Sequence, residues 1–215
     1  MTQPLPGFVS ADVRAEFPDL RLDWLNVSGR AGPSPRELVD RLARLSDRVR
    51  GASAVTMRAW PVPQAFRSFF RQIGLDPDVD RPPGERVAVA RLLDGGFRSA
   101  GLIEDARLVA LVDTGVPVWA LDADALDDRG LGIRTIGHDE PTRQAGHLAP
   151  GTLAVADGSR VHAVLFGEPL AGAAVGRSTT RVALYAIGVP GVPAIHVEEA
   201  LWTCVELIGG DSAGC

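Results

Sequence analysis

One segment sets the architecture of this 215-residue chain: Asp105-Ala-Arg-Leu-Val-Ala-Leu-Val-Asp-Thr-Gly-Val-Pro-Val-Trp-Ala-Leu-Asp-Ala-Asp124. It begins as an amphipathic run, breaks at Thr114-Gly115, and continues as a strand-like segment from Pro117 to Leu121 with an acidic end. Before it, apolar residues recur at helical spacing; after it, they form short runs between Gly, Pro and Asp. Helices followed by strands predict an α+β fold, in which a helical N-terminal half packs on a β-sandwich-like, strand-rich C-terminal half.

The expected helices and strands are bounded by residues typical of helix caps and turns. Ser34, Pro35 and Glu37 are typical of a capped helix start, and two more helices are expected from about Pro63 to Ile73 and from about Pro83 to Leu93. The strands are expected at Val116 to Leu121, Gly130 to Ile136, Thr152 to Ala156, Val161 to Phe166 and Val182 to Ile187, with a last helix from Val197 to Ile208. Residues 1–33, with β-like runs at Phe8 to Val13 and Leu20 to Val27, are expected as a lead-in to a single domain over residues 34–215.

The composition excludes several classes of protein. All 22 basic side chains are arginine, which excludes Schiff-base chemistry, pyridoxal attachment and the Gly-Lys phosphate loop. No apolar run reaches the roughly 20 residues of a membrane span, and no signal peptide is visible. These two absences, together with a count of only two cysteines, predict a cytoplasmic protein. The four histidines lack ligand spacing, so neither a metal nor a cofactor is expected.

Positive charge is concentrated in one region, although the net charge is −5. Residues 41–71 contain seven arginines and a single acid, Asp47. This is the one electrostatic pattern in the chain suited to a polyanion, and it nominates a set of RNA-binding residues: Arg41, Arg44, Arg48, Arg67 and Arg71. The alternative is a solvated helical surface.

The segment after Asp105 resembles one domain in particular. Asp105 precedes Asp122 by 17 positions, and the second aspartate ends the element Gly115-Val-Pro-Val-Trp-Ala-Leu-Asp122. This arrangement resembles the B3/B4 domain of the phenylalanyl-tRNA synthetase β subunit, which in the synthetase binds and clears wrongly charged tRNA. The resemblance extends over residues from about Arg58 to Tyr185. The further matches occur in the same order as in the family, on both sides of the segment from Asp105 to Asp122: Glu85, Arg91-Leu92, Ile133-Arg134, Glu140, Leu153 to Asp157, Leu165-Phe166-Gly167 and Thr179.

Three positions depart from the pattern of that family. Leu108 stands where the family has an asparagine, Trp119 where it has a histidine, and Tyr185 where it has a glutamate. The resemblance implies a free-standing tRNA-related domain that hydrolyses the ester of a mischarged aminoacyl-tRNA. The departures replace polar groups that could hold that ester. A non-catalytic module that binds RNA or an amino-acid-like metabolite is therefore the alternative.

The resemblance also nominates site residues. Glu140, Arg134 and Glu168 are the catalytic candidates, because editing requires polar groups that position an ester and a water. The candidates for contact with the amino-acid part of the substrate are Trp119, Gly167, Thr179 and Asp122. Each has a plainer alternative: Glu140 as an exposed loop acid, Arg134 as a structural partner of Asp122 or Asp124, and Trp119 as an ordinary buried tryptophan.

Overall fold

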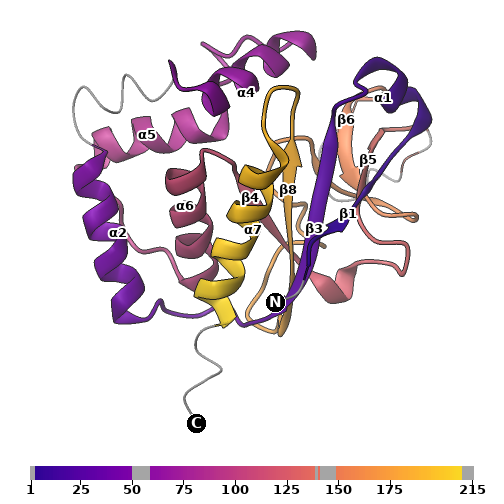
Figure 1. Ribbon diagram of the computed structural model, residues 1–215. Helices are drawn as coiled ribbons and strands as arrows, with labels where there is room; N and C mark the ends of the chain where they lie inside the picture. Colours follow the sequence, from indigo (N-terminus) through magenta and orange to yellow (C-terminus); the bar gives the residue numbers. More distant parts are fainter. Residues whose placement is uncertain (1–2, 50–58, 139, 141–148, 210–215) are drawn as a thin grey trace.

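The computed structural model describes residues 3–49, 59–138, 140 and 149–209, and it has the α+β architecture expected from the sequence. Two four-stranded sheets lie side by side, and helices cover the side of the first sheet that faces away from the second (Figure 1). The main apolar core includes residues of both sheets, from Val9 to Ile208, and a smaller cluster of Ile136, Ala154, Ala156 and Val161 packs on the second sheet.

The first sheet is wholly antiparallel, in the order β1 (Leu5–Pro6), β3 (Arg21–Ser28), β8 (Arg181–Gly188) and β4 (Val118–Asp122). All eight residues of β3 pair in register with β8. Every residue of β8 after its first is buried, as expected for a central strand that is covered on both faces.

The second sheet has the order β2 (Phe8–Val9), β5 (Gly132–Thr135), β6 (Leu153–Ala156) and β7 (Val161–Val164). The β2–β5 pair is parallel, and the other two pairs are antiparallel. Only Gly7 separates β1 from β2, so the chain passes there from one sheet to the other. A Cβ at Gly7 would lie 2.6 Å from the carbonyl oxygen of Leu131, so this crossing requires glycine.

Most predicted elements are confirmed. The helices α2 (Arg36–Arg48), α4 (Pro61–Gln72), α5 (Pro83–Asp94) and α7 (Ala194–Gly209) and the strands lie close to their expected positions. The amphipathic run belongs to α6 (Leu102–Thr114), which ends at Gly115 in the left-handed conformation, with φ of 77°. Left-handed backbone favours glycine, so the break at Thr114-Gly115 is the helix C-cap.

Two local predictions were wrong. The run from Phe8 to Val13 is not one strand, because β2 ends at Val9 and a short helix, α1 (Ala11–Glu16), follows. Ser34 does not cap α2, whose N-cap residue is Pro35. The Ser34 hydroxyl instead donates to the Asp105 carboxylate on α6, at 2.5 Å. Within the described ranges, no helix is long and apolar enough to cross a membrane.

Candidate functional site

A cavity of about 310 Å³ lies between α5, α6 and the start of β4. This volume is within the range of sites that bind small molecules. Its walls combine apolar residues with three arginines and three acids; the lining is formed by Pro83, Arg86, Val87, Arg98, Ala100, Glu104, Asp105, Arg107, Leu108, Leu111, Pro117, Val118, Trp119 and Glu168.

The three arginines of the cavity have no acidic partner among the residues that the structure describes. Arg107 Nε donates to the Val118 carbonyl at 2.7 Å, and Arg86 Nη2 makes a long contact of 3.4 Å to the Phe166 carbonyl. Neither these two nor Arg98 forms an ion pair with any carboxylate in the described part of the chain. Guanidinium groups that line a concave site without a counter-ion favour an anionic ligand.

The acids of the cavity differ in what they can offer a ligand. Asp105 is 1% exposed, and its carboxylate already accepts from the Ser34 and Ser99 hydroxyls and the Ala100 amide. Glu104 and Glu168 are exposed at the cavity. Asp105 therefore anchors α6 to the preceding segments, whereas the two glutamates remain accessible to a cationic group.

Trp119 is a buried tryptophan that also lines the cavity. It is 2% exposed, and it stacks on Tyr185, with ring centroids 5.5 Å apart and an interplanar angle of 12°. Burial raises the pKa of Tyr185, the charge of Arg107 opposes that rise, and Glu168 adds to it. The aromatic pair is therefore neutral and forms an apolar wall beside the charged groups.

Gly167, Asp122 and Thr179, expected to contact substrate, do not line this cavity. The Gly167 amide donates to the Val164 carbonyl at 2.8 Å, which closes a tight turn after β7. The Thr179 hydroxyl donates to the Asp122 carboxylate at 2.6 Å and ties the loop before β8 to the end of β4. These contacts are local or join neighbouring segments, and none of the three residues faces the cavity. Glu168, next to the turn at Gly167, does line it.

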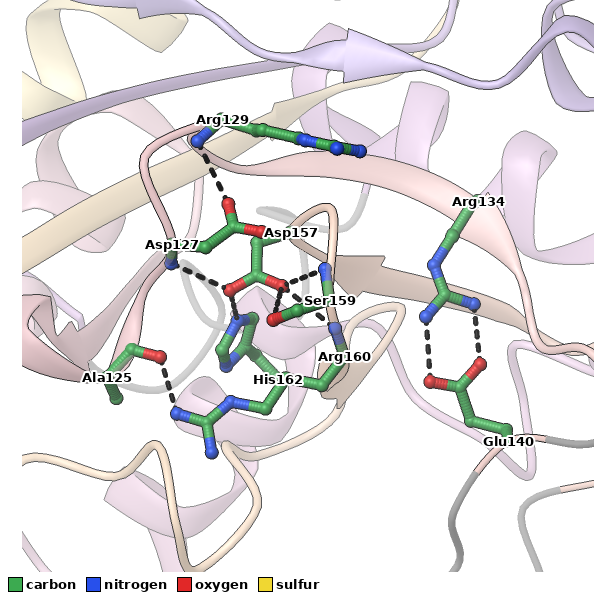
Figure 2. Close-up of polar contacts among 9 residues, drawn as sticks. All are labelled: Ala125, Asp127, Arg129, Arg134, Glu140, Asp157, Ser159, Arg160 and His162. Carbon is green, nitrogen blue, oxygen red and sulfur yellow. Dashed lines mark hydrogen bonds and ion pairs between the residues drawn. The ribbon is translucent and has the colours of Figure 1, made fainter.

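The two remaining catalytic candidates bind each other instead of facing the cavity. Arg134 donates to both carboxylate oxygens of Glu140, each at 2.7 Å (Figure 2). This contact raises the pKa of Arg134 and lowers the pKa of Glu140. Only 11% of the Glu140 side chain is exposed, so it is not an exposed loop acid, and its partner Arg134 is not engaged with the acids at the end of β4. Arg134 lies on β5 of the second sheet, and neither residue of the pair lines the cavity beside Trp119.

A buried polar cluster next to that pair was not predicted. The Asp157 carboxylate accepts from the Asp127, Ser159 and Arg160 amides, the Ser159 hydroxyl and His162 Nε2, at 2.7–3.0 Å (Figure 2). Burial alone would raise the pKa of Asp157, but these bonds outweigh it and hold the pKa well below its usual value. Burial lowers the pKa of His162 despite its acidic partner, so the imidazole is neutral and donates through Nε2.

The expected RNA-binding arginines do not form one free basic surface. Arg41 and Arg48 both bind the Asp113 carboxylate, at 2.9 and 2.6 Å. The Arg67 side chain is only 6% exposed and binds Glu85 and Asp78, so its assignment to an RNA surface was wrong. Arg44 and Arg71 are exposed. The other two arginines of the stretch, Arg50 and Arg58, lie outside the described residues.

Sequence reasoning missed Glu104, Arg107, Arg86 and Arg98 at the cavity. A signal was present on α6, because Glu104, Arg107, Leu108 and Leu111 are spaced i, i+3, i+4 and i+7 and therefore share one face. Arg86 and Arg98 come from other segments, and no local pattern connects them to that face. No group of three or more His, Cys, Asp or Glu side chains in the described ranges could hold a metal ion.

No protein-family model and no curated protein matches the sequence.

Proposed function

We propose that this protein binds a small ligand of the amino-acid class in the cavity between α5, α6 and β4. The observation that carries the proposal is the set of three arginines, Arg86, Arg98 and Arg107, that line one cavity without a carboxylate partner in the described part of the chain. A carboxylate is the acceptor that guanidinium groups bind in bidentate geometry. Glu104 and Glu168 supply acceptors for an ammonium group, and Trp119 supplies an apolar wall.

We expect Arg98→Gln to weaken binding of L-amino acids by tenfold or more, because a hydrogen bond to a charged group contributes about 1.5–3 kcal/mol. Arg98 suits the test because its side chain makes no hydrogen bond or ion pair within the described residues. Isothermal titration calorimetry with free amino acids and with their amides, which lack the carboxylate, measures the effect. Arg71→Gln, an exposed arginine on α4, is the matched control. Equal affinity of the two variants, or binding of the amides as tight as that of the acids, would contradict the proposal.

A second candidate is hydrolysis of mischarged aminoacyl-tRNA, in line with the resemblance to the B3/B4 domain. Asp105, Leu108 and Trp119, three positions that define that resemblance or its departures, line this same cavity together with Glu168. No Ser, Thr, Cys or His is among the lining residues that the structure describes. Hydrolysis there would thus rely on a water molecule that Glu168 orients, rather than on a covalent nucleophile. The exposed Arg44 and Arg71 support an approach of tRNA.

If the protein is a deacylase, Glu168→Gln should reduce the release of amino acid from mischarged tRNA by about 10²–10⁴-fold, the usual contribution of general acid–base catalysis. Glu140→Gln should retain the rate of the native protein, because Glu140 binds Arg134 away from the cavity. Release of radiolabelled amino acid from a panel of mischarged tRNAs measures both. The reverse pattern, or tRNAs that stay intact at micromolar protein, would rule out hydrolysis in this cavity.

A further inference from the structure

A second hollow adjoins the charged cavity, and its chemistry is different. Its lining is apolar apart from Glu85, and it includes Gly84 and Ala88 of α5, Phe97, and Val112 of α6. The space inside amounts to about 30 Å³. One water-sized group occupies roughly 10–15 Å³ on this measure, so the hollow accepts about two carbon-sized groups.

The two spaces share two walls, Val87 and Leu111. Val87 is on α5 and Leu111 is on α6, so the same pair of helices lines both spaces. Pro83 lines the charged cavity, and the next residue, Gly84, lines the apolar hollow. The hollow therefore borders the charged cavity at the two shared apolar side chains.

Glu85 does not make the hollow polar, because its charge is already satisfied. Both of its carboxylate oxygens accept from Arg67 Nη1 at 2.9 Å, and the Arg67 side chain is only 6% exposed. The other described side chains of the lining are apolar and offer no donor or acceptor to a polar group. A buried polar group without a partner is costly, so the hollow selects against hydroxyl- and amide-bearing ligands.

We propose that this hollow receives the side chain of the ligand and gives the site a preference for short aliphatic side chains, from alanine to valine. The inference rests on the proposed function, in which the charged cavity holds the amino-acid head group. Each methylene removed from water strengthens binding roughly fourfold, so the affinity should rise from glycine through alanine and 2-aminobutyrate to valine. It should fall again for phenylalanine, which exceeds the space.

Gly84→Ala tests this inference without disturbing the fold. A Cβ at Gly84 would lie 3.7 Å from Leu111 Cδ1, an ordinary van der Waals contact, and alanine is a better helix former than glycine. The added methyl occupies part of the hollow and leaves the arginines and glutamates untouched. We expect the valine-over-glycine preference, about tenfold or more in the native protein, to drop to about twofold or less in the variant, while the affinity for glycine stays unchanged.

The measurement is calorimetric titration of glycine, L-alanine, L-2-aminobutyrate, L-valine and L-phenylalanine into native protein, Gly84→Ala and the control Gly32→Ala. A Cβ at Gly32 would meet no atom within 4 Å, and the backbone there is not left-handed, so this variant should keep the native preference. Equal affinity of the native protein for glycine, alanine and valine would overturn the inference and leave the proposed function standing. A preference for valine that survives in Gly84→Ala would also overturn it. Failure of every amino acid to bind, glycine included, would instead overturn the proposed function.

Discussion

Asp157→Ala is expected to lower the free energy of unfolding by about 3–5 kcal/mol, because each buried donor that loses its acceptor costs about 1–3 kcal/mol. The Asp157 carboxylate is buried and accepts five hydrogen bonds, three of them from backbone amides. The variant leaves those amides and His162 Nε2 without this acceptor, and only part of the loss can be recovered by water that enters the space. Urea unfolding measures the loss.

Asp128, the acid that follows Asp127 in the chain, provides the control. It is exposed, so Asp128→Ala should change stability by less than about 0.5 kcal/mol. If Asp157→Ala were as stable as Asp128→Ala, the cluster would contribute nothing to holding the β6–β7 turn against the segment that contains Asp127.

The same cluster predicts that the stability of the fold depends on pH in two separate ranges. The folded pKa of His162 lies below its ordinary value of 6.5, so below pH 6.5 the unfolded state binds more protons and stability falls as the pH falls. The folded pKa of Asp157 is also depressed, so its contribution is complete above pH 3.8 and is lost as the pH drops below that value. His162→Gln should remove the pH dependence in the first range, with a slope of up to about 1.4 kcal/mol per pH unit.

Arg67→Met is expected to cost about 3–5 kcal/mol, the usual effect of removing one partner from a buried ion pair. The Arg67 guanidinium binds both oxygens of Glu85 at 2.9 Å and one of Asp78 at 2.6 Å. Methionine keeps the apolar stem but leaves the Glu85 carboxylate, whose side chain is 12% exposed, without its partner. Because Glu85 is on α5, which lines both the charged cavity and the apolar hollow, we also expect weaker amino-acid binding. Chemical denaturation and calorimetry measure the two effects.

Arg71→Met, one turn further along α4, is the matched control. Arg71 is exposed, so its replacement should leave stability within about 0.5 kcal/mol of the native value. Combining Arg67→Met with Glu85→Gln removes the unpaired charge of the Glu85 carboxylate and should restore part of the lost free energy of unfolding. A double variant less stable than the sum of the two single variants would contradict this account of the pair.

The sequence was sufficient to predict elements whose signal is local. The left-handed Gly115 after an amphipathic run, and the apolar runs of β4 to β8, depend on residues that are neighbours in the chain. Ser34 shows where this reasoning failed. Its sequence context matched a helix cap, in which the hydroxyl oxygen would accept from a backbone amide, but the hydroxyl instead donates to a carboxylate 71 positions away.

The candidate site was predictable only where its residues share one element. Trp119 was nominated from its place in the element that resembles the B3/B4 domain, and it does line the cavity. Arg134 and Glu140 were nominated as catalytic residues together with Glu168, but their side chains bind each other and do not line the cavity. Which carboxylate neutralises which arginine is decided by tertiary packing. For that reason the three arginines of the cavity became apparent only in three dimensions.

The register of the first sheet also constrains how the molecule is made. Its central pair joins β3, near the beginning of the chain, to β8, near the end, and the parallel β2–β5 pair is likewise long in sequence separation. Contacts of this kind close large loops and slow folding. During synthesis, β3 must therefore leave the ribosome and wait, with its apolar face uncovered, until β8 has been translated. Early exposure of such a strand favours aggregation, so the yield of folded protein should depend on chaperones and on the rate of translation more than on the stability of the finished fold.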